Sequence, residues 1–125
     1  MLPDLPRIIQ KREAGITPAI LSWFRENGPA TCLIEIKATT KNKIPASALL
    51  PHQRRALLDA CGGGIVYKLS DEARRQVPCD AFKISYTRAF VVCAFLSSPR
   101  VALVIDIKKW RGCDRATPCV YSFGL

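Results

Sequence analysis

Hydrophobic residues recur along this chain with two different periods, and these periods predict two kinds of element. Apolar runs and alternating stretches predict strands over residues 32–38, 65–69, 79–85, 88–95 and 100–107. Helical spacing predicts one helix over residues 11–27 and a second within residues 45–61. This order is typical of the α/β (α+β) class, with a mixed central sheet flanked by helices.

The first predicted helix presents an apolar face on which one acidic residue lies. That face is formed by Glu13, Thr17, Ile20 and Phe24, with Ile16 and Trp23 nearby. A shorter helix beginning at Pro18 and capped by Thr17 is an open alternative. We expect residues 1–9 to form an extended arm, residues 107–112 to form at most one helical turn, and residues 113–125 to be an irregular tail.

The second helix is predicted to begin near Pro51, because proline is tolerated in a first turn. Its apolar face is formed by Ala56, Leu57, Ala60 and Cys61. Gln53 lies one turn earlier on this face, and Arg54 and Arg55 point outward. The three glycines at 62–64 end the helix, and because they follow a helix they are not a phosphate-binding loop.

Glu35 and Lys37 interrupt the apolar strand predicted at residues 32–38. Because side chains alternate along a strand, these two project together, and Cys32, Ile34 and Ile36 project to the other face. Half-burying such a pair costs free energy unless each group has a partner. A divalent cation would satisfy the carboxylate, and a solvated cross-strand salt bridge is the alternative.

The composition favours a single domain that binds a polyanion. The 125 residues include 19 Lys and Arg against 10 Asp and Glu, a formal charge of +9. Nucleic acid is the leading partner, although a basic surface also suits anionic lipid or serves solubility. No run reaches the roughly 18 apolar residues of a membrane span. The start of the chain lacks a signal-peptide pattern, so we expect an intracellular protein, in the cytoplasm or a host-cell nucleoid, and not a secreted one.

The six cysteines favour reduced thiols over a disulfide framework. Cys32 and Cys93 lie in apolar strands and Cys61 near a helix end, where reduced cysteine acts as a small hydrophobic residue. Structural zinc fits poorly because no C-x-x-C pair is present. A disulfide between Cys113 and Cys119 is the remaining alternative.

One ordered series of residues resembles a known nuclease family. The series is Glu35-x-Lys37, Pro45, His52-Gln53, and Gly63-Gly64 leading into an apolar strand with Lys68. It is similar to the core of the PD-(D/E)XK nuclease superfamily, and more narrowly to its Holliday junction resolvase-like branch, over about residues 10–85. The resemblance implies a restriction-endonuclease-like core and a metal-dependent, structure-selective DNA endonuclease that resolves four-way junctions by paired phosphodiester hydrolysis.

The resemblance also implies roles for particular residues. Glu35 would bind Mg²⁺, or Mn²⁺ in its place, helped by the carbonyl of Ile36, and Lys37 would be the catalytic lysine. Gln53 would face the site from its helix, and Glu13 would occupy the acidic position of the first helix. The superfamily's aspartate just before E-x-K is absent here, and Asp80 is the best substitute as the second metal ligand. The alternative for Asp80 is an ion pair with Lys68 or Lys83.

The resemblance further implies branched double-stranded DNA as substrate and a homodimer as the assembly, because a four-way junction needs two symmetric cuts. The strands at 88–95 and 100–107 are the candidate interface. Basic residues expected to contact phosphates are Lys41, Lys43, Arg54, Arg55, Lys68, Arg74 and Arg75. Two other functions stay open: a non-catalytic nucleic-acid-binding protein, and a nuclease that acts on flaps, nicks or linear DNA.

Overall fold

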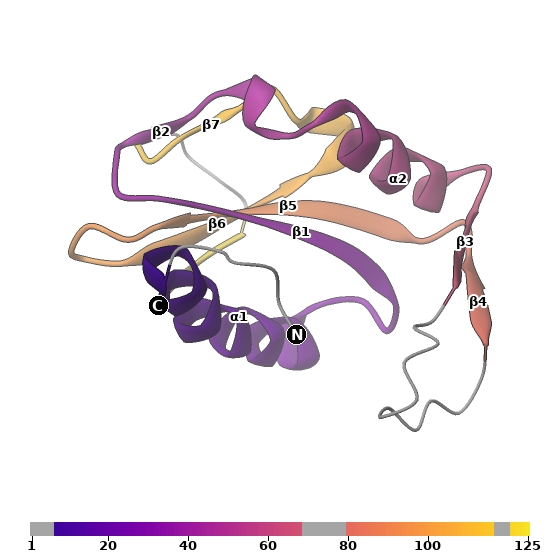
Figure 1. Ribbon diagram of the computed structural model, residues 1–125, viewed down its shortest axis with the longest axis horizontal. Helices are drawn as coiled ribbons and strands as arrows, with labels where there is room; N and C mark the ends of the chain where they lie inside the picture. The colour runs from indigo at the N-terminus through magenta and orange to yellow at the C-terminus, as the bar shows by residue number, and fades with distance from the viewer. Residues whose placement is uncertain (1–6, 69–79, 117–120) are drawn as a thin grey trace.

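A four-stranded mixed sheet with one helix on each face forms the centre of the protein (Figure 1). The computed structural model describes the backbone of residues 7–68, 80–116 and 121–125, and the side chains of these residues from Gly15 onward. The elements are α1 (Arg7–Asn27), β1 (Cys32–Thr39), β2 (Lys43–Ile44), α2 (Pro51–Cys61), β3 (Ile65–Lys68), β4 (Ala81–Ile84), β5 (Arg88–Phe95), β6 (Val101–Asp106), β7 (Cys113–Asp114) and β8 (Tyr121–Gly124), with short 3-10 turns at Ala46–Ala48 and Ile107–Lys109. The predicted mixed α and β class is confirmed.

The strand order in the central sheet is β1-β5-β6-β8. β1 and β5 are parallel, with Glu35 opposite Val91, and α2 lies in the crossover between them. β5 and β6 are antiparallel, and β8 pairs antiparallel with β6. β5 and β6 are therefore the two inner strands, and the residues of β5 from Ala89 to Phe95 are all buried.

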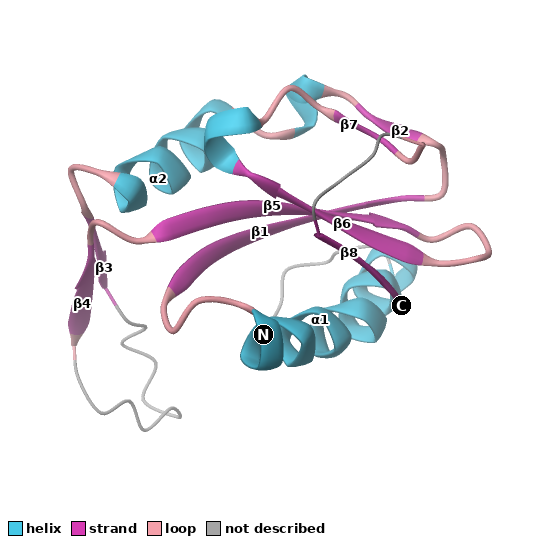
Figure 2. Cartoon of the chain, turned by 180° about the vertical axis from the view of Figure 1, so that it is seen from behind, coloured by secondary structure: helices cyan, strands magenta, loops and turns pink. Residues whose placement is uncertain are grey.

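Each face of the sheet has its own hydrophobic core. On one face, Leu57 of α2 packs over the odd-numbered side chains of β5, such as Val91 and Cys93. On the other face, Ile16, Ile20 and Phe24 of α1 pack on the even-numbered side chains of β5 and on β6. The helices lie on opposite sides of the sheet in both views (Figures 1 and 2). Among the described helices, none combines the length and apolar composition that a bilayer span needs.

The first helix is longer than the sequence suggested. α1 begins at Arg7, so residues 7–9 are helical and not part of an extended arm; residues 1–6 lie outside the described residues. The helix continues through Pro18, and the alternative of a shorter helix capped by Thr17 is wrong. Pro18 is exposed while Ile16 and Ile20 are almost fully buried. Packing on both sides of the proline therefore offsets the backbone hydrogen bond that its missing N–H cannot make.

The expectation of an irregular tail is also wrong. β7 pairs with β2, and β8 forms an edge of the central sheet, where Trp23 stacks on Phe123 with ring centroids 4.7 Å apart. These strands are short and their partners lie far away in the sequence, so local pattern does not reveal them. Arg115 donates to the carbonyls of Ser97 and Pro99 and thereby ties this segment to the turn between β5 and β6.

The described cysteines are free thiols, as expected. Cys93 and Cys113 are buried in the core beneath α2. A hydrogen bond from the Cys93 thiol lowers the pKa of Cys113, whereas burial raises the pKa of Cys32 against the opposing charge of Arg88. Cys79 and Cys119 lie outside the described residues, so the alternative disulfide does too.

We predict that Ile20→Ala lowers the free energy of unfolding by about 3 kcal/mol, because Ile20 is 0% exposed and the lost side chain leaves a cavity under the sheet. Leu21→Ala is the matched control, since Leu21 is the next residue of α1 and is 46% exposed. Its cost should stay below about 1 kcal/mol. Urea unfolding of both variants measures the difference, and equal costs would contradict this account of how α1 packs.

Candidate active site

The strand β1 separates its charged and apolar side chains onto the two faces of the sheet. Ile34 and Ile36 pack into the core beneath α1, and Leu33 packs into the core beneath α2. Glu35 and Lys37 share the face of Leu33, because side chains two residues apart project together. The prediction that Glu35 and Lys37 lie together, opposite the isoleucines, is confirmed.

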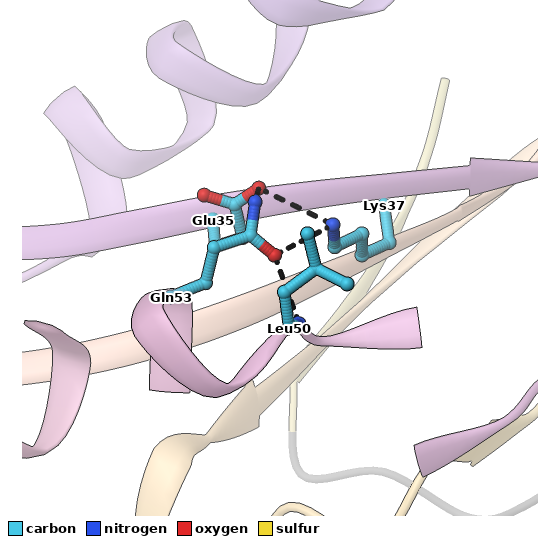
Figure 3. A network of polar contacts seen from close by, with 4 residues as sticks. All are labelled: Glu35, Lys37, Leu50 and Gln53. Atoms are coloured by element: carbon cyan, nitrogen blue, oxygen red, sulfur yellow. Dashed lines mark hydrogen bonds and ion pairs between the residues drawn. The ribbon is translucent and has the colours of Figure 1, made fainter. Parts of the chain in front are cut away.

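Gln53, in the first turn of α2, joins this charged pair to the helix (Figure 3). Its Oε1 accepts a hydrogen bond from Lys37 Nζ at 2.9 Å, and its Nε2 donates to Glu35 Oε1 at 3.1 Å. Lys37 Nζ also lies 3.6 Å from Glu35 Oε1. Gln53 was predicted to face the site from its helix, and it does.

The amide of Gln53 has only one favourable orientation. Its Oε1 also accepts the backbone N–H of Leu50 at 3.1 Å, so the oxygen has a cation and an amide proton as partners. Turning the amide over would place its NH₂ group against the ammonium of Lys37 and its oxygen against the carboxylate of Glu35. The three hydrogen bonds therefore position the side chain and, through Leu50, satisfy a donor at the start of α2.

The pair is half-buried but still accessible. The exposed fraction of the side chain is 20% for Lys37 and 31% for Glu35. An ammonium has three protons, and among the described residues Lys37 Nζ donates one of them to Gln53 and forms an ion pair with Glu35. Among the described residues, the Glu35 carboxylate contacts Gln53 and Lys37, and both contacts are made through Oε1. One N–H donor and one carboxylate oxygen thus stay available to a ligand that approaches this face.

Asp80 does not join Glu35. It is an exposed residue immediately before β4, and among the described strands β4 pairs only with β3, in a two-stranded sheet apart from the central one (Figures 1 and 2). Because β3 and β4 pair with each other, Asp80 lies outside the network that Glu35, Lys37 and Gln53 form. Among the described residues, no group of three or more His, Cys, Asp or Glu side chains is close enough to bind one metal ion.

Glu13 belongs to α1, which covers the face of the sheet opposite to Glu35 (Figure 1). The side chain of Glu13 lies outside the described part of the structure, as do Arg74 and Arg75. His52 is exposed and lines a groove on the outer side of α2 with Arg55 and Asp59.

The remaining predicted phosphate contacts are exposed, as such contacts must be. They are Lys41, Lys43, Arg54, Arg55 and Lys68. Lys41 follows the end of β1 and the two arginines follow Gln53 in α2, so these three lie close in sequence to the site. Lys43 is 79% exposed at its side chain and lies 3.7 Å from Asp114, an ion pair that contributes little at such exposure.

The sequence interpretation missed one member of the site, the backbone amide of Leu50. The signal was present, because a glutamine three residues after the residue that precedes a helix is half of a capping box. Leu50 was overlooked because its side chain is not a capping type.

We predict that Gln53→Ala lowers the free energy of unfolding by about 1–2 kcal/mol, because Lys37, Glu35 and the Leu50 amide each lose a partner. Arg54→Ala is the control, since Arg54 is the next residue of α2 and its side chain is exposed. It should change stability by less than about 0.5 kcal/mol. Thermal and urea unfolding give both values; a Gln53→Ala chain as stable as the wild type would show that the network is not formed.

Searches against protein-family models, curated proteins and solved structures find no significant match to this chain.

Proposed function

We propose that this protein is a metal-dependent, structure-selective DNA endonuclease that acts on four-way junctions. The observation that supports the proposal is the convergence of Glu35, Lys37 and Gln53 on one face of the sheet. These are three members of the E-x-K and H-Q series, and they come from two elements separated along the chain. A strand followed by a crossover helix and a parallel strand positions them.

The chemistry available at this site suits phosphodiester hydrolysis. Cleavage needs a water held for attack on phosphorus and positive charge near the phosphate oxygens. A remaining N–H of Lys37 can position the attacking water or donate to a phosphate oxygen, and the open oxygen of Glu35 is the hard ligand that a divalent cation prefers. Gln53 bridges the two groups of this ion pair and keeps both in place.

The site around Glu35 offers Mg²⁺ one carboxylate, which is the smallest number that magnesium sites in proteins commonly have. In proteins Mg²⁺ is commonly bound by one or two carboxylates together with waters and the substrate's phosphate oxygens. Glu35 and the carbonyl of Ile36 are the residues that would hold it. When bound, the ion supplies positive charge to the phosphate and lowers the pKa of a coordinated water. With a single carboxylate, occupancy would depend strongly on the DNA being present.

The charge of the protein supports DNA as the substrate. A formal charge of +9 attracts the phosphate backbone, and the exposed Arg54 and Arg55 lie next to Gln53 in α2. Such contacts position a duplex without reading its sequence, which is what selection for branched shape requires. A homodimer with two equivalent sites would cut a four-way junction symmetrically.

A non-catalytic nucleic-acid-binding protein is the second candidate. The separation of Asp80 from Glu35 favours it, because a second carboxylate within the same chain is then missing from the described residues. Such a protein would keep the basic surface and bind branched DNA without cutting it.

We predict that the wild-type chain nicks a labelled four-way junction at symmetric positions when Mg²⁺ or Mn²⁺ is added, and that chelation by EDTA abolishes the product. Glu35→Gln and Lys37→Met should each lower the single-turnover rate by about 100-fold or more, because each removes charge from the reacting phosphate or water. Both variants should still bind the junction.

Glu26→Gln and Lys109→Met are the matched controls, since both residues are exposed and lie outside the Glu35 network. They should cut at the wild-type rate. Binding without any product from the wild-type chain would support the non-catalytic candidate, and equal cutting of duplex, flap and junction would identify a nuclease of broader substrate range.

We predict that the logarithm of the DNA association constant falls linearly with the logarithm of the salt concentration, because phosphate contacts release counterions. Replacing both Arg54 and Arg55 with alanine should make the slope shallower by about 2 units. Leu58→Ala, an exposed neutral change in the same helix, should leave the slope unchanged. Fluorescence anisotropy at several salt concentrations measures all three slopes.

A further inference from the structure

β1 is an edge strand of the central sheet. Among the described strands it pairs only with β5, so the backbone groups on its other edge have no strand partner there. All eight residues of β1 are partly exposed, whereas seven of the eight residues of β5 are buried. Partial exposure of every residue is expected for an edge strand, because each residue is covered by β5 along one edge and is uncovered along the other.

An open edge of this kind favours pairing with another strand. β1 is eight residues long and contains Cys32, Leu33, Ile34, Ile36 and Ala38 beside only two charged residues. Long apolar edge strands present a row of unpaired N–H and C=O groups, and folded proteins usually shorten, charge or cover them. The charges of Glu35 and Lys37 give weak protection, because they are already engaged with each other and with Gln53.

Neither helix is centred on this edge. The fully buried side chains of α1 pack on β5 and β6, and the side chains of β1 lie at the margin of that core. On the other face, Leu57 of α2 is grouped with the buried residues of β5, and Leu33 of β1 is only a partly buried neighbour of that core. The described helices therefore cover the middle of the sheet and leave β1 at its boundary.

We propose that β1 pairs with β1 of a second copy of this chain, antiparallel and about a twofold axis at Ile36. A strand that pairs with its own copy in a closed dimer must be antiparallel, since the twofold axis reverses its direction. Two four-stranded sheets then form one continuous sheet, and the twofold axis perpendicular to it keeps the α2 helices of both copies on the same face.

Charge complementarity specifies the register. With the axis at Ile36, Glu35 lies opposite the partner's Lys37, and Lys37 lies opposite the partner's Glu35. Centring the axis on Glu35 or on Lys37 would instead place like charges directly opposite each other, which is destabilising. The spacing of two residues between an acid and a base makes the strand complementary to its own copy, and it does so only in this register. A second copy is therefore the occupant that this edge fits.

The pairing also bears on the proposed nuclease, and this consequence, unlike the dimer, rests on the proposed function. In the Ile36 register, Glu35 and the partner's Glu35 are diagonal neighbours, about 7–8 Å apart along the paired strands. The two sites of the dimer would lie side by side on one face of the continuous sheet.

A mixing experiment tests the dimer without reference to cleavage. We expect the wild-type chain to dimerise reversibly in sedimentation velocity. Glu35→Lys and Lys37→Glu should each weaken the homodimer by about tenfold or more, because each creates two pairs of like charges across the axis. Mixed in equal amounts, these two variants should form a heterodimer close to wild-type strength, because opposite charges then face each other again.

Glu26→Lys and Lys109→Glu are the matched controls; both residues are exposed away from β1, and neither change should alter the dimer. A variant that fails to fold would not regain dimerisation when it is mixed with the other variant. Dimer formation in the mixture therefore distinguishes a disrupted interface from a folding defect. A wild-type chain that is monomeric throughout, with another segment of its own covering β1, would overturn the proposal. So would a dimer that neither charge reversal weakens.

Hydrogen exchange of the wild-type chain adds a measurement that needs no variant. Residues 32–39 should exchange more slowly at concentrations above the dissociation midpoint than below it, and residues 7–27 should not change. Exchange of residues 32–39 that is independent of concentration would contradict pairing at β1. If the dimer forms and no DNA is cut, the proposed function fails while the interface stands.

Discussion

The side chain of Gln53 is the constraint on which the proposed site depends. Glu35 and Lys37 form an ion pair on one strand, and the net stabilisation from such a pair at a half-buried position is small. By accepting from Lys37 and donating to Glu35, the amide holds them 3.6 Å apart and leaves each with capacity for a further partner. The same amide accepts from Leu50, so the start of α2 and the charged strand hold each other in place.

This arrangement lies at an edge of the fold and not at its centre. β5, an inner strand, has only buried residues between Ala89 and Phe95. The buried residues of β5 offer no surface for the dimer interface that was expected at β5 and β6. β1 combines the charged pair with an open edge. A ligand on its face and a second chain along its edge could therefore be bound by one strand.

Local patterns predicted the parts of the structure that local physics determines. The alternation in β1 placed Glu35 and Lys37 together, and helical spacing placed Gln53 on the inner side of α2. Strand order depends on pairings between distant segments, so β8 beside β6 and β1 at the edge could not be foreseen. Asp80 was misplaced for the same reason, since its position follows from β3 pairing with β4 instead of with the central sheet.

Nuclear magnetic resonance of the side chains at this site tests the central claim most directly. When branched DNA that resists cleavage is titrated into labelled protein, the Lys37 ammonium and the Gln53 amide signals should shift together with those of Arg54 and Lys41. Shifts of the surface residues alone, with Lys37 and Gln53 unchanged at saturation, would contradict the claim that this face of β1 receives the DNA backbone.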